Sequence, residues 1–228
     1  MEKIILNSER VVVGVTGASG SLYAELLLQQ LLRAQVRTYL VVSETARKVI
    51  ATELTDRCSL LASALASNLQ IRLESNDTVK GVARALEIPD QNLEQLKVFS
   101  NDDFYAPIAS GSEGATHMVV APCSMGSLAR IAHGMSTCLL ERCADVMLKE
   151  RRSLVICPRE TPVSAIHLQN MITLIQAGAS IVPAMPAFYN RPQSIDDLAM
   201  FVVERLLDQL QLSALKDFKK VRWNVRRL

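Results

Sequence analysis

Strand-like and helix-like patterns alternate near the start of the chain. Arg10–Val15 is a run of mostly β-branched residues that leads into a glycine-rich loop, as expected of a buried strand. Leucines at helical spacing follow over 22–31, and the apolar run 36–42 predicts a second strand. Ser43 is placed to cap a helix that ends near Thr52. This alternation predicts a parallel sheet covered by helices.

The same alternation returns in the second half of the chain. Strands are predicted at 116–121, 154–157 and 179–182, and helices at 124–132, 139–150, 164–177 and from Ser194 to Leu210. The more polar stretch 56–103 is expected to be an elaborated connection with helical fragments and a strand at 96–99. We therefore predict a single doubly wound α/β domain over 1–212, followed by a basic tail over 213–228.

Composition and charge narrow the class of protein. Of the 228 residues, 49% are hydrophobic and 21% are charged, which excludes disorder of the whole chain. The net charge of +2 is too balanced for a dedicated nucleic-acid binder, and the excess lies in the basic tail. No apolar run is long enough for a membrane span or a signal peptide. We therefore expect a cytoplasmic protein that binds neither nucleic acid nor membrane.

The cysteines do not have the spacing of metal ligands or of a disulfide framework. They are Cys58, Cys123, Cys138, Cys143 and Cys157. We expect reduced, buried thiols and no metal site. Cys123 follows a predicted strand, but no histidine lies near it in the sequence, so a small buried residue is favoured over a nucleophile.

The loop 14–20 (GVTGASG) is a candidate phosphate-binding loop because it joins the first strand to a helix. Its glycines permit close backbone approach, and amides at the helix start can bind an anion. The alternative is a tight turn that binds nothing. A dinucleotide site usually ends the second strand with an acid, whereas Ser43 stands here, so FMN fits better than NAD.

Three further clusters follow predicted strands. Pro122–Ser127 (122–127, PCSMGS) offers hydroxyls and amides to a flavin, although an ordinary helix cap explains it equally well. The segment 158–162 (PRETP) suggests an anionic substrate with Glu160 as proton donor; the alternative is a surface ion pair. The apolar loop 183–192 either walls a pocket or is a rigid connector. These residues alone predict binding of a mononucleotide and a second phosphate ester but specify no reaction.

Taken together, the motifs resemble one family, the flavin prenyltransferases (UbiX/Pad type) of the flavoprotein group that also contains the cysteine decarboxylases. The resemblance covers about 11–211. It is carried by 15–20 (VTGASG), 109–112 (ASGS), 121–125 (APCSM), 144–152 (AD with LKERR), 158–162 (PRETP) and 186–194 (PAFY with RPQS).

The resemblance implies a flavodoxin-like or Rossmann-like fold in three layers and a metal-free alkyl transfer. In this reaction a dimethylallyl group passes from dimethylallyl monophosphate to N5 and C6 of reduced FMN. The product, prenylated FMN, serves a UbiD-type decarboxylase in ubiquinone or aromatic-acid metabolism. The family also implies a large homo-oligomer, typically a dodecamer.

Site residues follow from the matched positions. Expected FMN contacts are Gly17, Ala18, Ser19, Ser43, Ser124, Met125, Ser127 and Arg159. The expected substrate-phosphate pocket contains Ser110, Gly111, Arg142, Lys149, Tyr189 and Arg205, with help from Arg159. The expected catalytic residues are Glu160, which protonates the departing phosphate, Phe104, which shelters the allyl cation, and Ser19 and Glu53, which handle protons near N5. Arg142 is expected to reach a neighbouring subunit's site.

The chain departs from the family pattern at Gly126, where many relatives have lysine, and in its longer 56–103 connection. Two related functions stay open: an FMN-dependent cysteine-type decarboxylase, although its sequence motifs are not found here, and a non-catalytic FMN-binding protein. An NAD(P)-dependent oxidoreductase is disfavoured by Ser43.

Overall fold

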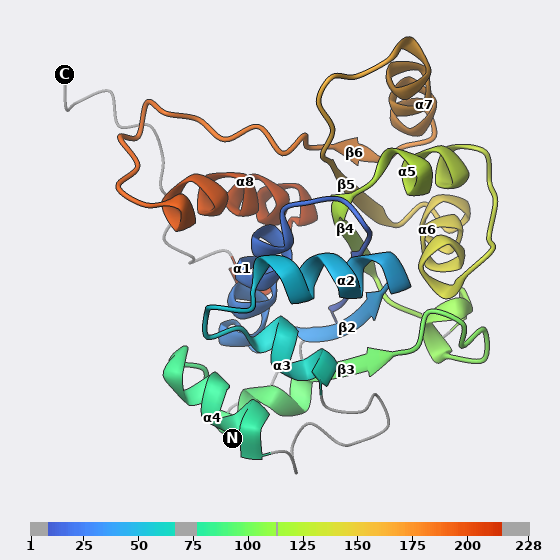
Figure 1. Cartoon of the computed structure of the whole chain (residues 1–228). Coiled ribbons are helices and arrows are strands. Elements are labelled where there is room, and N and C mark those ends of the chain that lie inside the picture. Colours follow the sequence, from blue (N-terminus) through green and yellow to red (C-terminus); the bar gives the residue numbers. More distant parts are fainter. Residues whose placement is uncertain (1–8, 67–76, 113, 216–228) are drawn as a thin grey trace.

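The sheet runs through the centre of the protein. The computed structural model describes residues 9–66, 77–112 and 114–215, and the statements below refer to these. All strand pairs are parallel, in the order β3-β2-β1-β4-β5-β6 (Figure 1). The strands are β1 (Arg10–Val15), β2 (Arg37–Val42), β3 (Leu96–Phe99), β4 (His117–Cys123), β5 (Ser153–Pro158) and β6 (Ser180–Ile181). The predicted doubly wound sheet is confirmed, with the strand order of Rossmann-like domains.

Helices cover both faces of this sheet. They are α1 (Ser21–Arg33), α2 (Glu44–Glu53), α3 (Leu60–Ala66), α4 (Asp77–Ala85), α5 (Met125–Ala132), α6 (Leu139–Lys149), α7 (Ala165–Gln176) and α8 (Ile195–Leu210). Short 3₁₀ helices lie at Asp90–Gln95, Pro107–Ala109 and Ser213–Leu215. None of the helices in these described ranges has both the length and the apolar character to cross a bilayer.

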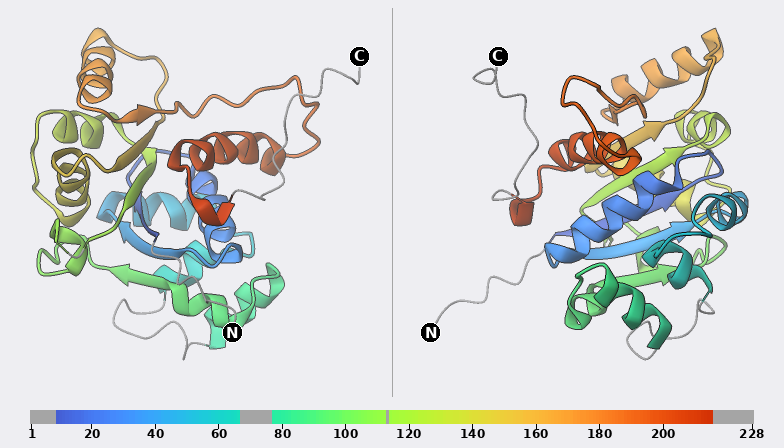
Figure 2. Two further views of the ribbon diagram at one scale, coloured as in Figure 1. Left: turned by 180° about the vertical axis from the view of Figure 1, so that it is seen from behind. Right: turned by 60° about the vertical axis from the view of Figure 1, so that its left-hand side comes forward.

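The two faces of β1 explain the three layers. Val11 and Val13 pack in a core with α1 and α8, whereas Val12 packs in a second core with α5 and α6. Figure 2 shows the helices on either side of the sheet. All three valines are fully buried, because a parallel sheet covered on both faces needs apolar residues at successive positions.

The polar connection packs on the same domain. Its helices α3 and α4 contribute Leu60, Leu61 and Val79 to the core that contains α1. The buried carboxylate of Glu25, on α1, accepts hydrogen bonds from the amides of Leu60 (3.0 Å) and Leu61 (2.7 Å). The expected helical fragments and the strand at 96–99 are confirmed. The basic tail from residue 216 onward lies outside the described residues.

The cysteines match the expectation only in part. Cys123, Cys143 and Cys157 are buried, Cys138 is half-buried and Cys58 is exposed. Burial raises the pKa of Cys143 and of Cys157 to about 12, so these thiols stay protonated at neutral pH. The prediction of a buried thiol is wrong for Cys58.

Candidate functional site

Hydrogen bonds join the loops that follow β1, β4 and β5. The amide and the hydroxyl of Thr16 both donate to the carbonyl of Pro122, at 3.2 and 3.0 Å. The amide of Ser124 donates to the same hydroxyl at 2.7 Å. The amide of Arg159 donates to the carbonyl of Cys123 at 3.1 Å. The carboxyl ends of these strands, which we call the carboxyl edge, therefore form one connected surface.

The side chain of Arg159 reaches across this surface. Its Nε donates to the carbonyl of Ser19 at 3.1 Å, which links β5 to the loop after β1. Glu160 turns away from Arg159, and its Oε1 accepts a hydrogen bond from the amide of Thr161 at 3.0 Å. Arg159 and Glu160, both described, make no ion pair with each other, so the surface-pair alternative is wrong.

Glu53 ends α2, and its carboxylate faces the start of α1. It accepts hydrogen bonds from the amides of Gly20 (3.0 and 3.1 Å) and Ser21 (2.7 Å). Burial raises the pKa of Glu53, but hydrogen bonds from Ser19, Ser21 and Gly20 outweigh it and bring the pKa below its ordinary value. The Glu53 carboxylate therefore accepts the hydrogen bonds of the amides at this helix start, and binding of a phosphate by the loop 14–20 stays a prediction.

Gly17 lets the loop after β1 pack closely on α2. A Cβ at Gly17 would lie 2.5 and 2.7 Å from side-chain atoms of Thr45, which leaves no space for a larger residue. Ser43 caps α2 by accepting a hydrogen bond from the amide of Ala46 at 3.2 Å, as predicted. The loop, the end of β2 and the first turn of α2 are thus in contact.

The first turn of α5 completes this group. Ser124 caps the helix by accepting from the amide of Ser127 (3.4 Å), and the two hydroxyls are 3.2 Å apart. Cys123 is fully buried beside them, and burial raises the pKa of its thiol well above its ordinary value, which favours a structural thiol over a nucleophile. The structure thus gathers at the carboxyl edge Gly17, Ala18, Ser19, Ser43, Glu53, Ser124, Met125, Ser127, Arg159 and Glu160.

A second group of predicted residues lies around α6. Its members are Ser110, Gly111, Arg142 and Lys149. The Nε of Arg142, in the first turn of α6, donates to the carbonyl of Ala109 at 3.1 Å. A Cβ at Gly111 would lie 2.4 Å from Oε1 of Glu150, whose carboxylate pairs with Lys149. Gly111 and Lys149 therefore lie near the amino end of β5, whereas the start of α6 is hydrogen-bonded to Asn101, just after β3.

The two groups are separated within one chain. Lys149 ends α6, just before the chain enters β5, and Arg159 directly follows β5. The six residues of β5 rise about 3.3 Å each, so the two ends of the strand are roughly 17 Å apart. A single chain therefore does not bring Lys149 and Arg159 into one phosphate pocket.

Tyr189 and Arg205 form a third group around Phe201 on α8. The rings of Tyr189 and Phe201 are 5.7 Å apart and nearly perpendicular, and the guanidinium of Arg205 lies 5.7 Å from the Phe201 ring. The loop 183–192 contributes to the lining of a cavity of about 310 Å³ beside Phe201, but no residue of 158–162 is among its described lining, so a pocket wall next to that cationic segment stays a prediction. Phe104 lies apart from this group, in the loop after β3, and is 46% exposed.

Sequence reasoning missed two polar residues of the carboxyl edge. Thr16 joins the loops after β1 and β4, and Arg130 on α5 donates to the hydroxyl of Ser127 at 3.3 Å. Thr16 lies within the glycine-rich loop 14–20, and its position directly after a buried strand could have predicted a buried, hydrogen-bonded hydroxyl. Arg130 follows Gly126 by one helical turn, and this spacing was the available signal.

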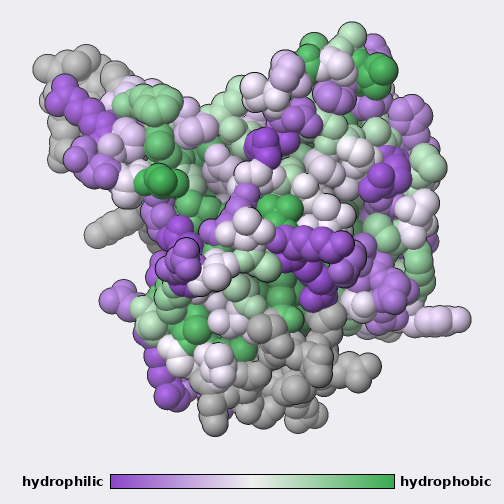
Figure 3. Space-filling model, viewed as in Figure 1, coloured by the Kyte–Doolittle hydropathy of each residue, from purple (hydrophilic) through white to green (hydrophobic). Residues whose placement is uncertain are grey.

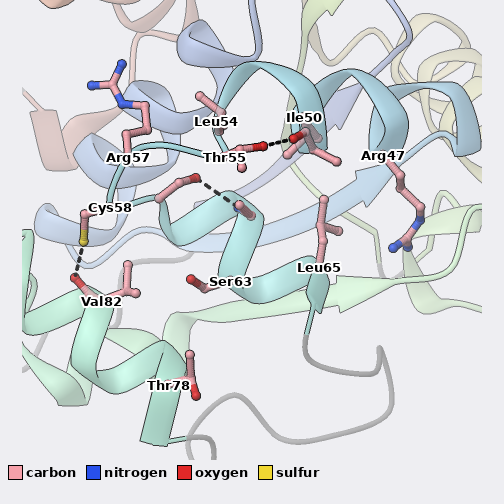
Figure 4. Close-up of a pocket in the computed structure, with 13 residues that line it drawn as sticks. Arg47, Ile50, Leu54, Thr55, Arg57, Cys58, Ser63, Leu65, Thr78 and Val82 are labelled. Atoms are coloured by element: carbon pink, nitrogen blue, oxygen red, sulfur yellow. Dashed lines mark hydrogen bonds between the residues drawn. The ribbon is translucent and has the colours of Figure 1, made fainter.

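A larger cavity lies elsewhere. It has a volume of about 540 Å³ and lies between α2, α3 and α4 (Figure 4). Ile50, Leu54, Leu65 and Val82 give it apolar walls, with arginines at either end of the view. None of its described lining residues belongs to the predicted site.

One helix has an apolar outer face. Ile166, Ile172 and Ile175 of α7 are 72%, 46% and 55% exposed. In Figure 3 hydrophobic side chains show at the upper right, where Figure 1 places α7. Such a face on a helix suits contact with another protein surface.

Comparison with known proteins identifies the family. The chain matches the family model described as Flavoprotein over residues 3–207. It is 44% identical over 208 residues to the flavin prenyltransferase UbiX of Alkalihalophilus pseudofirmus, covering 89% of this chain and 94% of the relative.

Two solved structures are similar as well. AnUbiX (PadA1), in complex with FMN and dimethylallyl pyrophosphate, is 39% identical with a TM-score of 0.74, covering 95% of this chain and 97% of that one. The dodecameric FMN-dependent UbiX-like decarboxylase from Escherichia coli O157:H7 is 38% identical with a TM-score of 0.72, covering 94% and 98%. Sequence and fold agree, and the chain belongs to the flavoprotein family, in its group of flavin prenyltransferases.

Proposed function

We propose that this chain transfers a dimethylallyl group from dimethylallyl monophosphate to N5 and C6 of reduced FMN and so makes prenylated FMN. One observation carries the proposal: the Arg159–Ser19 contact joins the loops after β1 and β5, and it places a guanidinium beside the predicted flavin contacts. The family membership supports the same reaction.

The chemistry divides between two groups of residues. Cleavage of the allylic C–O bond leaves its electron pair on the phosphate, and a guanidinium such as Arg159 stabilises that developing charge. Glu160 protonates the departing phosphate. Ser19 and ionised Glu53, which share a hydrogen bond, accept the proton that N5 loses when its bond to carbon forms. In the second step one carbon of the prenyl double bond takes up a proton, the other bonds to C6, and C6 loses its proton, so the ring closes with no net change in protons. Phe104 supplies a ring face to the allyl cation.

A complete phosphate pocket requires more than one copy of the chain. Lys149 lies at the other end of β5 from Arg159, and Arg142 belongs to the same helix as Lys149, so we assign both to the pocket of a neighbouring subunit. Ser110 and Gly111 accompany them, with Tyr189 from the loop before α8 and Arg205 from α8. The apolar face of α7 supports contact between copies, and we propose a homododecamer, as described for the similar E. coli O157:H7 protein.

Two further parts of the proposal concern the use of the product and the cellular location of the enzyme. Prenylated FMN passes to a UbiD-type decarboxylase, which uses it in ubiquinone or aromatic-acid metabolism. We place the enzyme in the cytoplasm, which the five unpaired thiols favour.

The decisive experiment is anaerobic incubation with reduced FMN and dimethylallyl monophosphate, followed by mass analysis of the flavin. We expect the flavin to gain one five-carbon unit, and a parallel reaction with the diphosphate identifies the preferred donor. Unchanged flavin from a protein that binds FMN would instead support the carrier or the decarboxylase.

A matched variant tests the proton donor. Glu160→Gln should keep its affinity for FMN, since its carboxylate contacts only the Thr161 amide, but turn over roughly 100-fold more slowly. Product formation at the wild-type rate would remove Glu160 from the mechanism.

A further inference from the structure

The hydroxyl of Thr16 bridges the loops that follow β1 and β4. It donates a hydrogen bond to the carbonyl of Pro122 at 3.0 Å and accepts one from the amide of Ser124 at 2.7 Å. These partners lie 106 and 108 positions away along the chain. Thr16 is only 1% exposed, so bulk water cannot replace either partner, and both bonds hold only while the two loops keep their spacing.

Hydrogen bonds on either side of Thr16 extend this bridge to the predicted flavin contacts. The carbonyl of Thr16 accepts from the amide of Ala18 at 2.9 Å, within the loop after β1. Ser124, which the Thr16 hydroxyl holds by its amide, caps α5 by accepting from the amide of Ser127. The position of the loop after β1 is therefore coupled to the position of the first turn of α5.

A second connection runs through β5 and returns to the loop after β1. The amide of Arg159 donates to the carbonyl of Cys123, and its Nε donates to the carbonyl of Ser19. The three loops thus form a closed ring of hydrogen bonds. Among the described residues, Thr16 makes three of the bonds between the loops after β1 and β4, and loss of its hydroxyl would leave only the one from its amide to Pro122, at 3.2 Å.

The proposed reaction depends on the spacing that this ring maintains. Ser19 and Glu53, the proposed proton acceptors, lie on the β1 side, because the carboxylate of Glu53 accepts hydrogen bonds from the start of α1. The first turn of α5 lies on the β4 side. Reacting atoms must approach to about 3–3.5 Å, and a misplacement of about 1 Å can lower the rate roughly 100-fold. A shift of one loop against the other would therefore move a flavin that contacts both away from its proton acceptors.

We propose that Thr16 is a positioning residue for FMN: its hydroxyl fixes the distance between the loops after β1 and β4 and thereby the place of the flavin relative to Ser19 and Glu53. This inference rests on the proposed function, because it assumes that FMN contacts both loops. Thr16 acts through its partners, since its hydroxyl is buried and engaged by Pro122 and Ser124.

The test uses Thr16→Val, which keeps the branched shape of the side chain and removes the hydroxyl. With reduced FMN at saturation, kcat should fall roughly 10- to 100-fold, while KM for dimethylallyl monophosphate should stay within about threefold. The visible circular dichroism of bound FMN, which reports the surroundings of the flavin, should differ from that of the wild type. Without FMN, hydrogen exchange of the amides over 123–127 should accelerate about 10-fold or more.

A matched threonine separates positioning from stability. Thr38 on β2 is also fully buried, and its hydroxyl donates to the carbonyl of Val36 at 2.9 Å. Thr38→Val and Thr16→Val should each lower the melting temperature by about 2–8 °C, but Thr38→Val should keep the wild-type kcat and dichroism. Thr16→Ser, which retains the hydroxyl, should keep most of the wild-type kcat. If Thr16→Val does not fold, Thr16→Ala removes the hydroxyl without placing a methyl group against the Ser124 amide.

Three outcomes would overturn the inference. They are wild-type kcat and dichroism in a folded variant that lacks the hydroxyl, an impairment of Thr16→Ser as large as that of Thr16→Val, and an equal loss of kcat in Thr38→Val. A wild-type protein that binds FMN but leaves it unchanged would instead contradict the proposed function. The exchange and dichroism measurements need no prenyl transfer, so they would still decide whether Thr16 positions the flavin.

Discussion

Two carboxylates beside the site differ in how they are held. Glu53 is exposed to solvent and accepts hydrogen bonds from the amides of Gly20 and Ser21. Glu141 is buried and depends on Arg130 and Thr137. A proton can reach Glu53 without any change in packing, whereas protonation of Glu141 breaks a buried ion pair. Glu53 is therefore suited to proton transfer, whereas Glu141 is suited to holding the side chain of Arg130 in place.

Acid stability tests the role of Glu141. Burial raises the pKa of this carboxyl, but hydrogen bonds from Thr137 and Arg130 outweigh it and bring the pKa below its ordinary value of 4.5. Its contribution to stability is therefore present above pH 4.5 and is lost as the pH falls through the folded-state pKa. Glu141→Gln should cost about 1–3 kcal/mol at neutral pH. Urea unfolding of both proteins from pH 7 to pH 3 measures this, and a difference that stays constant over that range would contradict the prediction.

Side chains that accept hydrogen bonds from first-turn amides determine where several helices begin. Ser164 and Ser194 form reciprocal caps with His167 and Asp197 at the starts of α7 and α8. At the start of α3 the hydroxyl of Ser59 accepts a hydrogen bond from the amide of Ala62 at 3.0 Å, and Glu25 on α1 accepts from the amides of Leu60 and Leu61 as well. The connection between α2 and β3 thus depends on a side chain distant in sequence.

Removal of the Glu25 carboxylate should destabilise α3 without destabilising the central strands. Glu25→Ala leaves the amides of Leu60 and Leu61 without an acceptor, and we expect a loss of roughly 2 kcal/mol in unfolding free energy. Hydrogen exchange should accelerate in α3 while the amides of β1 and β4 keep their protection at conditions where the variant is fully folded. Uniform acceleration over the sheet and α3 would show that Glu25 supports the whole domain instead.

The elements could be predicted from sequence because their signals are local. Runs of valine over 11–13 and serine caps such as Ser43 act within a few residues of themselves. The Glu25 cap could not be predicted, since it joins positions 35 apart. The separation of Lys149 from Arg159 could have been predicted, since Lys149 precedes the strand predicted at 154–157 and Arg159 follows it.

At the scale of the whole molecule, two residues of the proposed phosphate pocket lie at opposite ends of one strand. Arg159 lies at the carboxyl edge and Lys149 at the amino end of β5. A pocket that uses both is built from two copies, and this is an arrangement that closed oligomers make available. The division of the chain into a domain over 1–212 and a basic tail over 213–228 stays a prediction.

Mixing two inactive variants tests the shared pocket. Lys149→Ala and Arg159→Ala should each lose most activity because each removes a cation from every pocket. When the two are unfolded, mixed in equal amounts and refolded together, about a quarter of the pockets should contain both native residues and regain activity. Separately refolded samples, combined afterwards without subunit exchange, serve as the control. An equally inactive mixture would mean that both residues act within one chain.

Under the proposed shared pocket, the placement of Lys149 and Arg159 at opposite ends of β5 predicts that the turnover rate depends on protein concentration. If each pocket contains side chains from two subunits, a single subunit has no complete pocket and is inactive. Dilution below the concentration at which the subunits associate should therefore lower the specific activity. In mixed oligomers, inactive variant subunits should also lower the activity of the wild-type subunits.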